Sequence, residues 1–141
     1  MGETTVKTKN DEKTHEFWDN DDNHYIFTEK KYSLYLEYSQ SISDLKKDLV
    51  LWAATEADCS ARLDTLIPYS EKLNAELDDY AFEHERITED QINQYNDIIL
   101  TIRELTRRGR LASIVVEAVE NHISELAEEV LKLEEESIVR E

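Results

Sequence analysis

The residues around Asp19 are the chain's closest approach to a calcium-binding pattern. Asp19, Asp21 and Asn23 offer side-chain oxygens at alternate positions, as the first half of a calcium loop does. The sixth position of such a loop needs glycine for a sharp turn, and the twelfth needs a bidentate glutamate. Those positions hold His24 and Lys30. The sequence therefore predicts no metal site in this segment.

Two other patterns concern metal chemistry and nucleophilic catalysis. Glu12 and His15 have the Glu-x-x-His spacing of di-iron helical bundles, but the second such pair of that ligand set is missing. Cys59 is the only cysteine and lies on an apolar helical stripe, where a small buried thiol is the ordinary interpretation. The chain also lacks a glycine-rich phosphate loop and a Gly-x-Ser-x-Gly motif. We therefore expect a protein that is not an enzyme and that has no cofactor.

The strongest chemical signal is an excess of acidic side chains. The chain of 141 residues has 33 Asp and Glu against 16 Lys and Arg, which gives a net charge of −17. Two dense groups of carboxylates are expected to bind a partner: Glu76, Asp78, Asp79, Glu83 and Glu85, and then Glu125, Glu128 and Glu129. Rows of carboxylates along a helix can imitate a phosphate backbone and attract a basic surface. Direct contact with nucleic acid depends on Lys and Arg and is therefore disfavoured.

Two smaller groups of side chains are further candidates for partner binding. Arg107 and Arg108 belong to a run of four arginines within eight residues, and such a run can pair with carboxylates or phosphates. The same arginines could instead complement the end of a helix at Gly109. Tyr32 and Tyr35 belong to an aromatic segment, and tyrosine is enriched among the residues that dominate binding energy at interfaces.

A heptad pattern predicts a first long helix over residues 29–67. Apolar side chains repeat there at alternating spacings of three and four, as in a coiled coil, and only Glu56 interrupts the stripe. Thr28 is a suitable N-cap. Pro68 cannot continue the helical hydrogen-bond ladder, so we expect the helix to end before it.

Two further helices are predicted downstream. A short apolar stripe indicates a helix over residues 70–86. Thr88 and Gln91 then form a capping box that starts a third helix, over residues 89–139. Its heptad stripe passes through Gly109 without a change of phase, although glycine is also the usual residue after a helix end. Both alternatives stay open, namely four helices with a turn at Gly109 or three helices with continuity through it.

These patterns predict an all-α fold in one helical domain, residues 28–141. Its architecture would be an elongated antiparallel helical bundle or coiled coil of three to four helices. Residues 1–27 hold few apolar groups and a run of Asp and Asn, so we expect a flexible acidic tail. The sequence contains no apolar stretch near the roughly 20 residues that cross a bilayer, no secretory signal and no cysteine pair. We therefore expect a cytoplasmic protein that contacts no membrane.

The charge pattern favours a protein that binds, and inhibits or adapts, a basic partner that handles nucleic acid. By analogy in charge and size, such a protein would be a nucleic-acid mimic of the kind that phages and mobile elements use. The alternative is a coiled-coil structural or assembly subunit of a larger complex. A homodimer is compatible with both functions.

Overall fold

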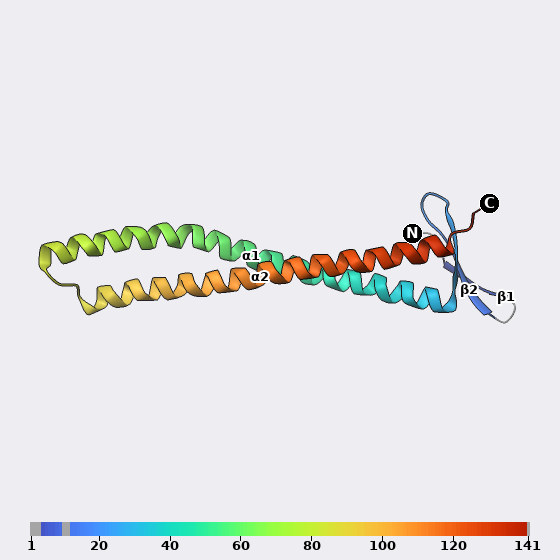
Figure 1. Ribbon diagram of the computed structural model, residues 1–141, viewed down its shortest axis with the longest axis horizontal. Helices are drawn as coiled ribbons and strands as arrows, with labels where there is room; N and C mark the ends of the chain where they lie inside the picture. Colours follow the sequence, from blue (N-terminus) through green and yellow to red (C-terminus); the bar gives the residue numbers. More distant parts are fainter. Residues whose placement is uncertain (1–3, 10–11, 141) are drawn as a thin grey trace. The chain divides into compact units, whose positions relative to one another are not determined.

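The computed structural model describes residues 4–9 and 12–140, with side chains from Lys13 onward. The elements are β1 (Thr4–Lys9), β2 (Glu12–Trp18), β3 (His24–Thr28), α1 (Glu29–His84) and α2 (Glu89–Ser137) (Figure 1). The chain divides into unit 1, residues 1–48 and 119–141, and unit 2, residues 49–118. The predicted all-α class is confirmed in outline, since the two helices contain 56 and 49 residues and pack against each other. The predicted number of helices, three to four, is wrong because the described residues contain two.

The helix that begins after Thr28 does not end at Pro68. The Thr28 hydroxyl oxygen accepts a hydrogen bond from the backbone N–H of Lys31 at 3.3 Å, which confirms the predicted cap. The helices predicted over residues 29–67 and 70–86 are nevertheless one helix, α1, with Pro68 inside it.

The physical reason for this continuity is the phase of the apolar stripe. Ser70, Leu73 and Leu77 continue the three-and-four spacing beyond Pro68, and all three are buried or half-buried, whereas Pro68 itself is exposed. A proline inside a helix costs about 3 kcal/mol, mainly through a lost hydrogen bond and a ring clash. Burial of a continued stripe offsets that cost, since each buried large apolar side chain contributes about 1.5–3 kcal/mol.

The second long helix has the start that the sequence predicts. The backbone N–H of Thr88 donates to Oε1 of Gln91 at 2.9 Å, and the backbone N–H of Gln91 donates to the Thr88 hydroxyl oxygen at 3.2 Å. This is a reciprocal capping box. The helix then runs through Gly109, whose φ is not positive, so the alternative with a turn at that residue is wrong.

The segment predicted to be a flexible tail forms a three-stranded sheet in unit 1. The strand order is β1-β2-β3 with antiparallel pairing, and Phe17 of β2 lies opposite Tyr25 of β3. Phe17, Tyr25 and Phe27 form one core cluster with Tyr35 of α1 and Leu133 of α2. The expectation of a flexible tail is therefore wrong for the described residues of this segment. Its three aromatic side chains form an apolar face, which residues from the two helices cover.

A turn held by the Asp19 carboxylate joins β2 to β3. One carboxylate oxygen of Asp19 accepts hydrogen bonds from the backbone N–H groups of Asp21 and Asn23, both at 2.9 Å. The other accepts from the Asn23 side-chain amide and the Tyr25 hydroxyl, each at 3.1 Å. Desolvation raises the pKa of the Asp19 carboxyl, but these hydrogen bonds outweigh it and leave the pKa lowered. The two carboxylate oxygens of Asp19 thus stabilise the turn of the β2–β3 hairpin.

The end of α2 is also fixed within unit 1. The helix ends at Ser137, two residues earlier than predicted, and Ile138 forms a bridge with Tyr25. The backbone N–H of Val139 donates to the carbonyl oxygen of His24 at 2.7 Å. Burial, followed by the negative charge of Asp19, raises the pKa of the nearby Glu134 carboxyl.

Unit 2 is a pair of antiparallel helix segments joined by residues 85–88 (Figure 1). Its buried side chains alternate at heptad spacing on the facing sides of the two helices: Cys59, Ser70 and Leu77 on α1, and Leu105 and Ala112 on α2. Gly109 allows the helices to approach, because a Cβ atom at this position would lie 3.3 Å from the Cβ atom of Cys59. Within the described ranges, neither helix has an apolar segment able to cross a membrane.

Candidate partner-binding surfaces

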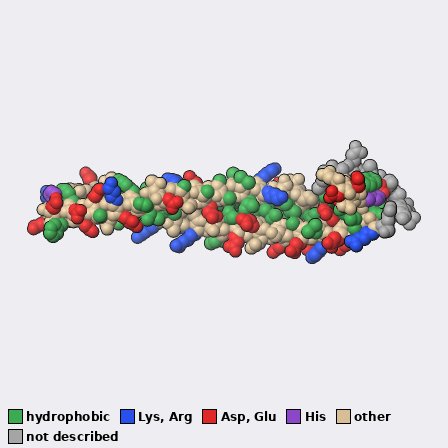
Figure 2. Space-filling view, turned by 90° about the horizontal axis from the view of Figure 1, so that it is seen from above, with side chains coloured by type: hydrophobic (Ala, Val, Ile, Leu, Met, Phe, Trp, Pro, Cys, Tyr) green, Lys and Arg blue, Asp and Glu red, His purple; other side chains and the backbone are tan. Residues whose placement is uncertain are grey.

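The first predicted acidic group lies at the closed end of unit 2. Glu76, Asp78, Asp79 and Glu83 are exposed on the last turns of α1, and Glu85 is exposed just beyond it. None of the five forms an ion pair with Lys or Arg among the described residues. Red carboxylates are prominent at the left end of Figure 2, and few blue cations accompany them. The cluster is therefore available to a cationic partner.

The second predicted acidic group belongs to unit 1. Glu125, Glu128 and Glu129 are exposed on α2. Glu129 accepts a hydrogen bond from Nζ of Lys132, one helical turn later, at 3.2 Å. This pair partly neutralises the second group, so the first group carries more uncompensated negative charge.

The predicted arginines lie on α2 of unit 2 and share one carboxylate. Nη2 of Arg107 lies 3.2 Å from Glu104, and Nη2 of Arg108 lies 3.6 Å from the same side chain. Arg103 and Arg110 form no ion pair with any described carboxylate. The charges of Arg107 and Arg108 are thus partly neutralised by a carboxylate of their own helix, whereas those of Arg103 and Arg110 are not.

The predicted tyrosines line the core of unit 1. Tyr35 is 6% exposed, and burial, followed by the negative charge of Glu134, raises the pKa of its hydroxyl. Tyr32 is half-buried, and its ring stacks on His15 with the ring centroids 3.8 Å apart. Both rings therefore pack inside their own unit, with Tyr35 the more deeply placed.

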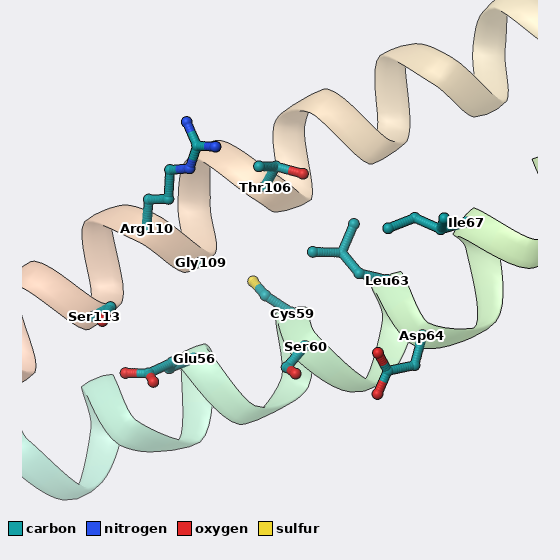
Figure 3. A pocket seen from close by; sticks show the side chains of 10 residues that line it. All are labelled: Glu56, Cys59, Ser60, Leu63, Asp64, Ile67, Thr106, Gly109, Arg110 and Ser113. Carbon is teal, nitrogen blue, oxygen red and sulfur yellow. The ribbon is translucent and has the colours of Figure 1, made fainter.

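A groove between the helices of unit 2 was not foreseen from the sequence. Its volume is about 390 Å³, and its lining is Glu56, Cys59, Ser60, Leu63, Asp64, Ile67, Thr106, Gly109, Arg110 and Ser113. Figure 3 shows Cys59 and Leu63 directed from α1 toward α2, whereas Arg110 is directed away from α1. The floor is therefore formed mainly by apolar residues, with the half-buried Glu56 beside them, and Asp64 and Arg110 lie at the rim. The absence of a side chain at Gly109 helps to keep this space open.

Four of the uncharged residues that line the groove belong to a longer row of uncharged positions, which we name the uncharged flank, whereas Glu56, Asp64 and Arg110 line the groove from outside that row. In heptad terms it comprises the e positions of both helices in unit 2: Ala53, Ser60, Ile67, Asn74 and Ala81 on α1, and Ile92, Ile99, Thr106 and Ser113 on α2. The e positions of antiparallel helices lie on the same side of the pair. The groove confirms this arrangement, because Ser60 and Ile67 line it together with Thr106 and Ser113.

The opposite flank of unit 2 is different in character. A hollow of about 280 Å³ on that side is lined by Arg62, Leu100, Thr101, Glu104, Leu105 and Arg108. Charged side chains at such positions are typical of a solvent-exposed coiled-coil flank. The sequence does distinguish the two flanks, because the e positions are uncharged. These positions directly follow the d positions of the apolar stripe, so the stripe alone does not reveal them.

The described residues contain no group of three or more His, Cys, Asp or Glu side chains placed to hold a metal ion. The sites that remain are surfaces: the acidic cluster, the partly paired arginines and the uncharged flank. Comparisons with family models, curated proteins and solved structures find no match for this chain.

Proposed function

We propose that this chain is a non-enzymatic protein that binds a basic surface of another protein, one that handles nucleic acid. The observation that carries the proposal is the charge of residues 71–97, where nine carboxylates accompany two cations. All nine are exposed, and none is paired with Lys or Arg among the described residues. A surface with this much uncompensated charge steers a basic partner toward it.

The spacing of the acidic side chains suits a partner that normally holds a phosphate backbone. Glu76, Asp79 and Glu83 follow one another at intervals of three and four residues, which places them about 4.5 and 6 Å apart along the helix axis. Phosphates of one DNA strand are about 3.4 Å apart along the duplex axis, so the three carboxylates, which span about 10.5 Å, cover about the length of three phosphate intervals. Occupation of a nucleic-acid groove in this way would inhibit the partner or recruit it.

The test is capture of partners by the full-length chain, compared with capture by a variant with three isosteric substitutions. The variant is Glu76→Gln, Asp79→Asn and Glu83→Gln. We expect the full-length chain to retain a nucleic-acid-handling protein that moderate salt or added duplex DNA releases. The variant should retain at least tenfold less, because the carboxylates supply the attraction.

A matched control removes the same amount of charge elsewhere, through Asp44→Asn, Asp58→Asn and Glu117→Gln, all at exposed positions. This control should retain the partner nearly as well as the unmodified chain. Equal retention by the two variants, or release that salt and DNA do not promote, would sink the proposal.

A second function, an assembly subunit of a larger complex, is favoured by the apolar side chains on the outside of unit 2. Val50, Leu51 and Ile114 are 68%, 67% and 66% exposed, and Phe82 is 87% exposed. Scattered exposed apolar side chains are ordinary, but a second chain that covered several of these would remove apolar area from water. This function predicts complexes that high salt does not dissolve.

A further inference from the structure

The uncharged flank of unit 2 has a composition that a solvent-exposed coiled-coil flank does not require. Charged residues make up 35% of the chain, so about three of these nine e positions would be charged if the positions were ordinary surface. None is. Ile67 and Ile92 are 40% and 46% exposed on this flank. In coiled coils the e and g positions usually carry Glu and Lys, which keep the flank in water.

The shape of the flank also fits a covering helix. The groove of about 390 Å³ is floored by Cys59, Leu63 and Gly109, so a side chain from another helix can enter between α1 and α2. From Ala53 to Ala81 the flank is about 42 Å long, and two adjacent helices are about 20 Å wide. A contact over this whole face, with its charged rims included, would cover on the order of 800 Å² per partner, which is the size of a stable protein interface.

At the level of the groove the two rims of the flank carry opposite charges, whereas the α2 rim becomes acidic farther along the helix, at Glu89 and Glu117. Asp64 lies on the α1 rim of the groove, and Arg110 lies on the α2 rim. Because Cys59 lies opposite Gly109, Asp64 is at nearly the same height along the helices as Arg103 on the antiparallel α2. Arg103 and Arg110 lack ion pairs with described carboxylates, so both cations are available to a second chain.

We infer that the uncharged flank binds the same flank of a second copy of this chain. A two-fold axis parallel to the helices places α1 of one copy against α2 of the other and leaves the two copies level. That symmetry brings Asp64 of each copy beside the partner's Arg103. Other two-fold arrangements of the flank would pair like rims. The result is a four-helix arrangement of unit 2.

This inference rests on the second proposed function and names its partner, and it is independent of the basic partner. The first experiment is the molar mass of the full chain, by sedimentation equilibrium at 50 and 500 mM NaCl over a range of concentrations. We expect a dimer of about twice the 16.6 kDa chain mass, with tighter association at higher salt. Salt screens the repulsion between two chains of net charge −17 more than it weakens a mainly apolar interface.

Two matched variants locate the interface. Ser60→Glu with Ser113→Glu places charge on the uncharged flank at exposed positions, and Ala61→Glu with Ala118→Glu adds the same charge at exposed positions outside it. The first variant should weaken dimerisation at least 100-fold, and the second less than about threefold in 500 mM NaCl. Circular dichroism should show equal helix content in both, since all four positions are on helix surfaces.

A charge reversal tests the symmetry. Asp64→Arg alone and Arg103→Asp alone should each weaken the dimer, and the double variant should restore it to within a few-fold of the original. A chain that stays monomeric in 500 mM NaCl at every concentration overturns the inference, as does a dimer that the Ser60 and Ser113 substitutions leave intact. A monomer that still captures a basic protein overturns this inference alone, whereas a dimer that captures none overturns the first proposed function alone.

Discussion

Substitution of Gly109 tests the helix contact on which unit 2 depends. A Cβ atom at this position would lie 3.3 Å from the Cβ atom of Cys59, which is tighter than most contacts of this kind. In an unobstructed helix, Gly→Ala stabilises by about 1 kcal/mol through helix propensity. Here the new methyl group must displace its neighbour, so most of that gain is lost. We expect Gly109→Ala to change the free energy of unfolding by less than about 0.5 kcal/mol.

A larger side chain at Gly109 should give a clear loss. Gly109→Leu adds three more carbons to a site where the first already touches Cys59, and overpacking of this kind costs about 1 to 3 kcal/mol. Urea denaturation followed by circular dichroism measures both changes. Ala61 is exposed on α1 of the same unit and supplies the controls: Ala61→Gly should cost about 1 kcal/mol, and Ala61→Leu should be nearly neutral.

Three results on Gly109→Ala lead to different conclusions. A change near zero agrees with a close helix approach. A gain equal to the loss from Ala61→Gly would refute that approach, because the methyl group would then meet nothing. A loss of about 1 to 2 kcal/mol would indicate an even closer approach, in which neither helix can shift to admit the methyl group.

Three further perturbations test local features of the fold. Glu85 follows α1 with a φ of 57°, so Glu85→Gly should raise the free energy of unfolding by about 1 kcal/mol, and a decrease measured by urea denaturation would contradict this backbone assignment. Thr88→Ala removes the hydroxyl of the capping box and should cost about 1 kcal/mol in the same assay, whereas Thr88→Ser should cost much less. The raised pKa of Glu134 means that protonation favours the folded state, so stability associated with this group is lost as the pH rises. Glu134→Gln should therefore be more stable than the unmodified chain at pH 7, with the difference shrinking as the pH falls toward 4.5; a difference independent of pH would refute the assignment.

Local signals in the sequence were sufficient for the helix starts and for the stripe that packs the helices. The Thr88 and Gln91 capping box needs only residues three apart, and the Thr28 cap needs only the turn that follows it. Such features depend on nearby atoms, so they can be recognised without knowledge of the fold. The seam on α2 was likewise predictable, since Leu105 and Ala112 are buried at the expected spacing.

Pro68 predicts a helix end only when its local cost is considered without the apolar stripe around it. The positions that follow it, Ser70, Leu73 and Leu77, keep the phase of the preceding heptads, and a new helix would have no reason to do so. Unbroken phase across a proline is thus evidence for one helix. It indicates that packing along the whole seam compensates for one missing hydrogen bond.

The sheet of unit 1 was harder to foresee because its core comes from segments far apart in the sequence. Tyr25 and Phe27 alternate with exposed side chains along β3, which is a strand signal. The segment is too short to be stable alone, and its aromatic face is covered by Tyr35 and Leu133 from the two helices. Composition suggested a solvated tail, since the Asp and Asn residues that close the hairpin are also common in disordered segments.

The two proposed binding surfaces of unit 2 differ in how salt should affect them, and this difference follows from their composition. Carboxylates at Glu76, Asp79 and Glu83 attract a basic partner through charges that remain in water, so added salt weakens that complex. The uncharged flank buries small and apolar side chains, and the main force against its association with a second copy is repulsion between chains of net charge −17. Added salt therefore strengthens that association. One salt titration that follows both the dimer and the captured protein should move them in opposite directions, and parallel changes would mean that a single surface serves both.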